Sequence, residues 1–222
     1  MKDFTIKQIK TLCLGNKLPL DIPFIDERME EYREKYNGNH QYYAVLHAIT
    51  KALEPAVVLE IGTWEGTSAA CFAAGFPDAE VFTIDHHSDP GDEKNYQRTQ
   101  EAMVKYPNIR YFQGCSTERV HAEKPGTRWV YPNIVEALAG RKIDILFIDG
   151  WHRGDMARAD WDTYSPLLGN HSLVICDDIC GGDDPTISGM LKFWEALPGE
   201  KHLDGWIHPG YPMGFLKYVE PA

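Results

Sequence analysis

The 222-residue sequence has no apolar run long enough to cross a bilayer, and its first ten residues, MKDFTIKQIK, are largely polar. A transmembrane helix needs about 20 consecutive, mainly apolar residues, and a secretory signal needs a shorter apolar segment. Both features are missing here. The sequence therefore predicts a cytoplasmic protein that does not contact a membrane.

Cysteines and basic residues are also few. The five cysteines form no dense pattern, so a disulfide framework is not expected and free thiols in a reducing compartment are favoured. Cys176 and Cys180 lack the second pair that would complete a zinc site. The chain has 22 basic and 33 acidic residues, a net charge of −11. Such a surface repels phosphate backbones, so nucleic acid is not the expected partner.

Short apolar runs alternate with helical patterns from residue 55 onward. Strands are predicted at residues 56–61, 80–84, 109–112, 143–148 and 172–176. Helices are predicted at residues 67–74, 94–105, 134–139, 155–168 and 187–197, and a terminal antiparallel pair at 206–208 and 214–219. Alternation of this kind indicates an α/β sheet with mostly parallel strands, in which ligands bind beyond the carboxyl ends of the strands.

The first 54 residues have a different character. Residues 1–24 predict an irregular arm, and residues 25–53 hold two helical patterns that are separated at Asn37-Gly38-Asn39. The second pattern begins near residue 40 and ends before Pro55. We therefore expect an N-terminal arm with helices over residues 1–54, which caps the cofactor-binding part over residues 55–222 and belongs to the same domain.

A glycine turn, EIGTWEGTS at residues 60–68, follows the first predicted strand. The G-x-G-x-x-G pattern of dinucleotide-binding turns is missing, and Glu65 would repel a diphosphate. S-adenosylmethionine has no phosphate; its ammonium suits a carboxylate such as Glu60, and its carboxylate suits Ser68 and the turn amides. Asp85 ends the next strand about 20 residues later, where an acid binds ribose hydroxyls. Together the turn and this acid predict a pocket for S-adenosylmethionine.

These segments resemble a known family. VLEIGTWEGTSA at residues 58–69 and VFTIDHH at 81–87 resemble class I S-adenosylmethionine-dependent methyltransferases. Among them they look most like metal-dependent O-methyltransferases of the catechol O-methyltransferase type and the related macrolide-sugar and cephalosporin-pathway enzymes. The resemblance covers roughly residues 40–180. It implies a Rossmann-like α/β fold, with a mostly parallel seven-stranded sheet flanked by helices and an N-terminal helical extension.

The resemblance also extends the expected cofactor site beyond the turn. Ser116 and its neighbour Thr117 would contact the adenine, and Trp151 would pack near it. The complete set predicted to bind the cofactor is Glu60, Gly62, Thr63, Gly66, Ser68, Asp85, His86, Ser116, Asp149 and Trp151. A loop rich in Ser and Thr also commonly caps a helix, and this alternative stays open for Ser116 and Thr117.

Three aspartates follow two of the predicted strands. Asp149 comes directly after residues 143–148, and Asp177 and Asp178 come after residues 172–176. Like charges that lie close together need a cation, and Mg²⁺ or another divalent cation prefers oxygen ligands. The resemblance implies that all three bind such a metal, with helix or turn capping as the alternative. The catechol type has an amide at the position of Asp178, so this site would be more anionic.

His152 lies three residues after Asp149, where the resembling enzymes place a catalytic base. An unperturbed imidazole has a pKa of about 6.5, which suits proton transfer near neutral pH. The implied reaction is methyl transfer to a hydroxyl of a small-molecule acceptor: a sugar, a catechol or another natural product. A homo-oligomer is compatible with this interpretation. Alternatives are metal-independent transfer, a non-catalytic S-adenosylmethionine-binding protein and another Rossmann-type nucleotide-binding enzyme.

Overall fold

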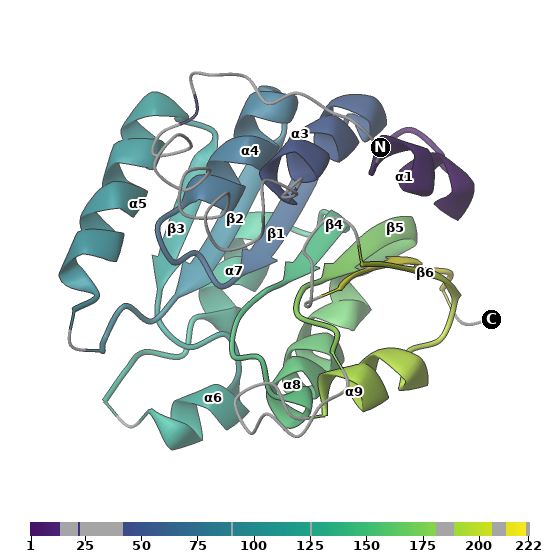
Figure 1. Cartoon of the computed structure of the whole chain (residues 1–222). Helices are drawn as coiled ribbons and strands as arrows, with labels where there is room; N and C mark the ends of the chain where they lie inside the picture. Colours follow the sequence, from purple (N-terminus) through teal and green to yellow (C-terminus); the bar gives the residue numbers. More distant parts are fainter. Residues whose placement is uncertain are drawn as a thin grey trace.

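The computed structural model describes residues 1–13, 22, 42–89, 91–124, 126–180, 189–205 and 212–220. At its centre is a seven-stranded sheet with the order β3-β2-β1-β4-β5-β7-β6 (Figure 1). The strands are β1 (Val57–Ile61), β2 (Glu80–Asp85), β3 (Ile109–Gln113), β4 (Ile143–Ile148), β5 (Leu168–Cys176), β6 (Glu200–Asp204) and β7 (Met213–Lys217). Strands β1 to β5 pair in parallel, and β7 pairs antiparallel with both β5 and β6. The predicted mostly parallel α/β sheet is confirmed.

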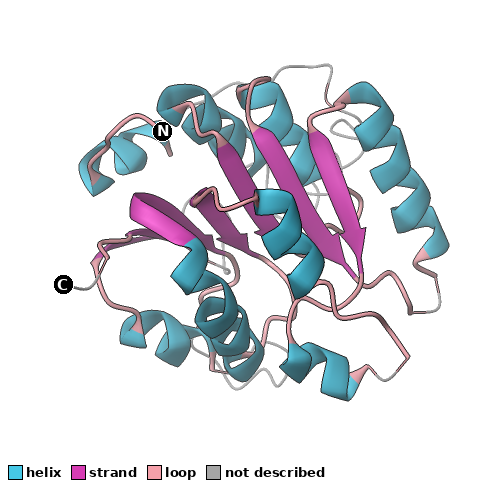
Figure 2. Cartoon of the chain, turned by 180° about the vertical axis from the view of Figure 1, so that it is seen from behind, coloured by secondary structure: helices cyan, strands magenta, loops and turns pink. Residues whose placement is uncertain are grey.

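Helices cover both faces of the sheet and give three layers (Figure 2). Helices α1 (Ile6–Leu12), α3 (Tyr42–Leu53), α4 (Thr67–Gly75) and α5 (Glu93–Lys105) share one core cluster with the sheet. Helices α7 (Tyr131–Leu138), α8 (Gly154–Tyr164) and α9 (Met190–Ala196) share the other, and α6 (Glu118–Glu123) contacts α8. In the described ranges, no helix is both long enough and apolar enough to span a bilayer.

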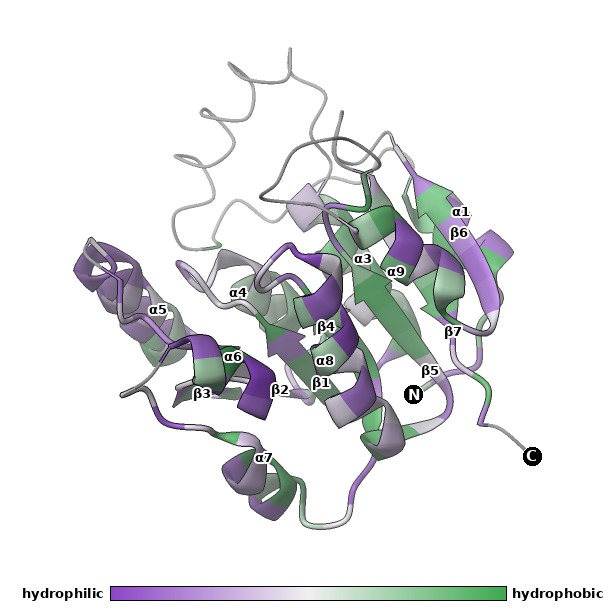
Figure 3. Ribbon diagram, turned by 90° about the horizontal axis from the view of Figure 1, so that it is seen from below, coloured by the Kyte–Doolittle hydropathy of each residue, from purple (hydrophilic) through white to green (hydrophobic). Residues whose placement is uncertain are grey.

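Strands β1, β2 and β4 are mostly buried because both faces of the sheet are covered. Successive side chains of a strand point to opposite faces. Val58 of β1 accordingly packs in the cluster beneath α3 and α4, while Val57 and Leu59 pack in the cluster beneath α7 and α8. Figure 3 shows this distribution as hydrophobic strand ribbons in the middle and a hydrophilic α5 at the outside. Continuous apolar runs are typical of such doubly covered parallel strands.

Three helices differ from the prediction. Residues 1–24 are not irregular throughout, because α1 begins after Thr5, whose side chain forms a capping box with Gln8. The helix predicted to reach residue 168 ends at Tyr164, because a 3-10 turn at Ser165–Leu167 that contains Pro166 leads directly into β5. Helix α6 was not predicted at all. The first helical pattern, residues 25–36, lies outside the described residues.

The terminal antiparallel pair exists, but its first strand is Glu200–Asp204, which the sequence analysis missed. The expected strand at 206–208 lies outside the described residues. Strand β6 is polar and mostly half-buried or exposed, so it lacks the apolar run by which the five parallel strands were found. The second strand of the pair, β7, lies within the predicted 214–219 apart from its first residue, Met213.

Helices α3 and α4 pack so closely that their contact requires a glycine. A Cβ atom added at Gly75 would lie 2.7 Å from the backbone oxygen of His47 and 2.8 Å from Cβ of Thr50. We predict that Gly75→Ala lowers the free energy of unfolding by about 1–3 kcal/mol, because the helices must move apart. At Gly205 nothing lies within 4 Å of the added atom, so Gly205→Ala should change it by less than about 0.5 kcal/mol. Urea unfolding followed by circular dichroism measures both, and equal effects would contradict the prediction.

Candidate active site

The carboxyl ends of the five parallel strands open onto one cavity of about 710 Å³. Their registers align these ends, since Ile61 lies opposite both Ile84 and Ile148, and Ile148 lies opposite Cys176. Most of the predicted site residues line this cavity: Gly62, Thr63, Ser68, Asp85, His86, Ser116, Asp149, Trp151, His152, Asp177 and Asp178. Glu60 and Gly66 are the exceptions, and both lie behind the cavity wall.

The two glycines shape the turn between β1 and α4. Gly62 has a φ of +100°, and a Cβ atom there would lie 2.0 Å from the backbone oxygen of Asp149. Gly66 has a φ of +76° and is the residue from which α4 begins. Glycine adopts such left-handed backbone without strain. The turn therefore packs directly against the end of β4. The parts of the cavity wall that follow β1 and β4 are in contact as a result.

Glu65 does not act as the sequence analysis assumed. Its Oε1 accepts a hydrogen bond from Nη1 of Arg98 on α5 at 2.8 Å, and the residue is 5% exposed. An ion pair of this kind offsets much of the charge that would repel a diphosphate. The charge of Glu65 therefore does not exclude a dinucleotide, and the missing G-x-G-x-x-G pattern is what disfavours one.

Glu60 is fully buried under the turn. Its Oε2 accepts a hydrogen bond from the Thr83 hydroxyl at 2.5 Å, and Thr63 Oγ1 lies 2.5 Å from that same hydroxyl. Burial raises the pKa of Glu60 to about 8, although hydrogen bonds from Ser68 and Thr83 act in the opposite direction. A positive charge in the adjoining cavity would favour the ionised carboxylate.

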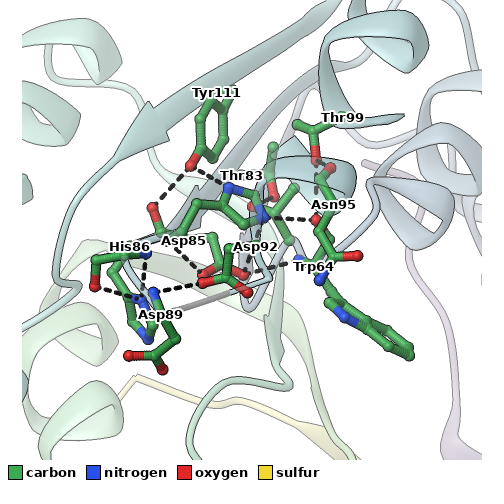
Figure 4. Close-up of polar contacts among 12 residues, drawn as sticks. Trp64, Thr83, Asp85, His86, Asp89, Asp92, Asn95, Thr99 and Tyr111 are labelled. Atoms are coloured by element: carbon green, nitrogen blue, oxygen red, sulfur yellow. Dashed lines mark hydrogen bonds and ion pairs between the residues drawn. The ribbon is translucent and has the colours of Figure 1, made fainter. Parts of the chain in front are cut away.

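Asp85 is held at the end of β2 by backbone amides. The Trp64 amide donates to its Oδ2 at 2.8 Å, and the His87 amide lies 3.3 Å from its Oδ1. The His87 ring bridges the Tyr111 hydroxyl and the Trp64 carbonyl, each at 2.6 Å. Figure 4 shows these contacts, with the indole of Trp64 pointing away from the cluster. His86, which the sequence predicts, also lines the cavity, and the neighbouring His87 fixes this corner of it.

The segment after β3 contributes a pair of hydrogen-bonded side chains. Ser116 Oγ donates to Oδ1 of Asp160 on α8 at 2.7 Å, and the Tyr164 hydroxyl donates to the Ser116 carbonyl at 2.8 Å. Thr117 accepts a hydrogen bond from the Val120 amide and caps α6, so the capping alternative is confirmed for Thr117. Burial raises the pKa of Asp160 to about 7, with the Ser116 hydrogen bond opposing this.

Asp160 itself was missed by the sequence analysis. The signal that could have found it is its place on the apolar face of α8, among Met156, Ala157, Trp161 and Tyr164. A carboxyl on such a face needs a reason to be buried. Trp151, on the loop after β4, is 36% exposed, and Lys124 Nζ and Arg153 Cζ lie 5.8 Å and 5.4 Å from its ring centroid.

The loops after β4 and β5 meet around His152. Its Nε2 lies 3.2 Å from Asp149 Oδ1, and its Nδ1 lies 2.6 Å from Asp178 Oδ2. The Tyr42 hydroxyl of α3 donates to the other oxygen of Asp149 at 2.6 Å. Asp177 is 4% exposed beside them. Tyr42 was not predicted, because its partner is 107 residues away in the chain.

The two carboxylates control the charge of the imidazole. Burial lowers the pKa of His152, but the hydrogen bonds and charges of Asp149 and Asp178 outweigh it and raise this pKa to about 11. Burial is also the main reason why the pKa of Asp149 is raised. In this arrangement His152 is an imidazolium, and it stands between two of the three predicted metal ligands.

A second group of candidate ligands lies at the rim of the cavity. Among the residues that the structure describes, one set of three has donor atoms within 4.8 Å of one another, namely His86, Asp89 and Asp92. Asp149, Asp177 and Asp178 are not that close. Asp89 is also paired with Lys124 at 2.5 Å, which offsets charge in the rim group.

Comparison with known proteins agrees with this geometry. A family model described as a methyltransferase domain matches residues 59–179, slightly more than half of the chain. The protein y4gI of Sinorhizobium fredii, itself of uncharacterised function, is 24% identical over 158 residues. This match covers 67% of the chain but only 16% of that curated relative.

Three solved structures have the same fold. A candidate caffeoyl-CoA O-methyltransferase from Staphylococcus aureus superposes with a TM-score of 0.62 at 18% identity, over 86% of this chain and 91% of its own. The S-adenosylhomocysteine complex of a Bacillus cereus O-methyltransferase gives 0.59 at 16%, over 90% and 93%. TomG of Streptomyces achromogenes, an O-methyltransferase of tomaymycin synthesis bound to S-adenosylmethionine, gives 0.59 at 17%, over 96% and 97%. The predicted Rossmann-like fold is thereby confirmed.

The buried Glu60 leads to a prediction about stability. Between its ordinary pKa of 4.5 and its folded pKa of about 8, the folded protein holds a proton that the unfolded chain has released. Stability of the ligand-free protein therefore falls as pH rises through this range. We expect Glu60→Gln to raise the unfolding temperature near pH 7 and to flatten its decline with pH.

The control for this experiment is Glu101→Gln, an exposed residue of α5. It should leave both the unfolding temperature and its pH dependence unchanged. Differential scanning calorimetry over a series of pH values measures both variants. A Glu60→Gln protein that melts lower than the wild type near pH 7 would show that the ionised carboxylate stabilises the fold.

Proposed function

This chain belongs to the methyltransferase-domain family, and we propose that it transfers the methyl group of S-adenosylmethionine to a hydroxyl of a small molecule. The observation that supports this most directly is the convergence of Asp85, Ser116, Asp149 and His152 on one cavity, with Glu60 buried beneath its glycine turn. These groups come from the ends of four strands, and each suits a different part of the cofactor or the reaction.

The cofactor would lie across the carboxyl edge of the sheet. Asp85, oriented by the Trp64 and His87 amides, would accept hydrogen bonds from the ribose hydroxyls. Ser68 and the amides of the turn would hold the cofactor's carboxylate. Glu60 lies one layer deeper, where its charge would stabilise the ammonium and sulfonium end through the turn.

A divalent cation belongs to this proposal, with Asp149, Asp177 and Asp178 as its ligands. The donor types suit Mg²⁺, because three carboxylates on adjoining strand ends offer the oxygen atoms that it prefers. Their oxygens do not all lie within 4.8 Å of one another in this structure, so the three carboxylates would have to converge around the ion. When bound, the cation would lower the pKa of the acceptor hydroxyl and help to orient it.

His152 would accept the proton of the acceptor hydroxyl. With only Asp149 and Asp178 beside it, the His152 imidazole stays protonated, because both carboxylates stabilise its charged form. The base role therefore requires that their charge be offset, which a bound cation would supply. Tyr42, hydrogen-bonded to Asp149, would keep that carboxylate in place.

Metal-independent transfer is a second candidate, and one observation favours it. His152 contacts two of the three proposed ligands directly, so its ring engages carboxylates that a cation would need. In that case the aspartates would orient His152 and the acceptor. Positioning the acceptor oxygen in line with the methyl group and sulfur would then supply most of the acceleration.

Binding of S-adenosylhomocysteine tests the cofactor assignment. We predict that the wild type binds it and that Asp85→Ala weakens binding roughly 10- to 100-fold, because two hydrogen bonds to a charged group are lost. Asp162→Asn, an exposed α8 residue paired with Arg158, is the matched control and should bind normally. Isothermal titration calorimetry gives the affinities. A folded wild-type protein that binds no S-adenosylhomocysteine would refute the proposed function.

Mn²⁺ binding distinguishes the two groups of candidate ligands. With S-adenosylhomocysteine present, Asp177→Asn should weaken Mn²⁺ binding at least about tenfold, and Asp92→Asn in the rim group should not. Electron paramagnetic resonance of free Mn²⁺ provides the measurement. The opposite pattern would assign the metal to the rim. Methyl transfer that persists in excess chelator, measured as S-adenosylhomocysteine release, would support the metal-independent candidate instead.

A further inference from the structure

Asp160 is a buried carboxyl that the proposed reaction does not use. It is 1% exposed, lies in the middle of α8, and nevertheless lines the same cavity as Ser116 and Trp151. Its Oδ1 accepts the Ser116 hydroxyl at 2.7 Å. In the hydrogen bonds of the described residues, this is the one donor to the carboxyl, and no cationic side chain contributes to its environment.

A purely structural role does not account for this arrangement. An asparagine would satisfy the Ser116 hydroxyl equally well, without the cost of burying an ionisable group. A buried carboxyl with a neutral partner is stabilised when a further donor reaches its second oxygen. The cavity is where such a donor can come from, since protein atoms already surround the rest of the residue.

The surrounding residues suit a purine. Gly114, Ser116 and Val120 form the wall that follows β3, and Trp151 lies on the loop after β4. Gly114 has a φ of +154°, and a Cβ there would lie 2.2 Å from the Arg128 oxygen, so this wall is tightly packed. Asp85, the proposed ribose ligand, lies opposite Gln113 in the sheet, next to this wall. A base attached to that ribose would therefore extend toward Ser116 and Asp160.

We propose that Asp160 recognises the 6-amino group of the cofactor's adenine through its Oδ2, and that Ser116 is the positioning residue that orients it. This inference rests on the proposed function, because it presupposes that the cavity binds S-adenosylmethionine. The Ser116 hydroxyl donates its hydrogen bond to Oδ1 of Asp160. Oδ2 of Asp160 is left as an acceptor toward the cavity. A purine with a 6-oxo group would place its oxygen, an acceptor, against Oδ2, which is also an acceptor. Such a purine would therefore bind more weakly.

The test compares S-adenosylhomocysteine with S-inosylhomocysteine, in which a 6-oxo group replaces the 6-amino group and the adjacent N1 carries a hydrogen. Calorimetric titrations are run at about pH 8.5, where a carboxyl with a pKa of about 7 is ionised. The wild type should prefer the adenine ligand by roughly 10- to 100-fold, the equivalent of one hydrogen bond to a charged group. This comparison needs no variant, so it does not depend on whether a substitution at a buried site folds.

Asp160→Asn gives the sharper result. The Ser116 hydroxyl fixes the amide oxygen of the new side chain, so the amide nitrogen faces the cavity and donates to a 6-oxo group. The preference should therefore shrink or reverse in favour of S-inosylhomocysteine. Asp162→Asn on the same helix should keep the wild-type preference, since Asp162 is exposed and paired with Arg158.

Each other outcome overturns a different claim. If the wild type binds both ligands equally, the cofactor assignment stands but Asp160 does not recognise the amino group. If folded Asp160→Asn loses affinity for both ligands in the same proportion, Asp160 has a structural role only. If the folded wild type binds neither ligand, the proposed function fails, and this inference fails with it.

Discussion

The site depends on one constraint: acidic side chains are buried in the apolar region where the parallel strands end. Glu60, Asp160 and Asp177 are each at most 5% exposed, close to strands that are almost entirely apolar. Charge removed from water is stable only beside suitable partners. For Glu60 and Asp160 those partners are neutral hydroxyls, whose hydrogen bonds only partly oppose the burial that raises both pKa values. This burial lowers the stability of the ligand-free protein. Under the proposed function the same carboxyls would accept hydrogen bonds from a ligand that carries donors and positive charge.

The acidic groups at the two ends of the cavity differ in their surroundings. Asp160, at the proposed purine end, is alone with a serine hydroxyl and suits the recognition of a neutral amino group. Asp149 and Asp178, at the other end, share the His152 ring and act on its charge as a pair. Groups of one chemical type thus acquire different roles from their environments. Under the proposed function, recognition of the cofactor would lie on the β3 and α8 side, and proton transfer on the side where β4 and β5 end.

The features that could be predicted from the sequence are those that a short local pattern of residues encodes. The five parallel strands were found because each is a short apolar run, and Asp85, Asp149, Asp177 and Asp178 were found because they directly follow such runs. Contacts between distant segments leave no local pattern: Tyr42 meets Asp149 across 107 residues, and Ser116 meets Asp160 across 44. Strand β6 was missed for the related reason that a polar edge strand lacks an apolar run.

Strained backbone conformations occur at several residues that line the cavity. Non-glycine residues rarely adopt positive φ, at a cost of about 1–3 kcal/mol each. Trp64, His87 and Asp178 do so at φ values of 46°, 39° and 54°, and all three surround this cavity. The first two direct their amides onto the Asp85 carboxylate, and the third brings its own carboxylate onto His152. Because the rest of the fold supports this strain, the acidic groups are oriented before any ligand arrives, so less ordering remains to oppose binding.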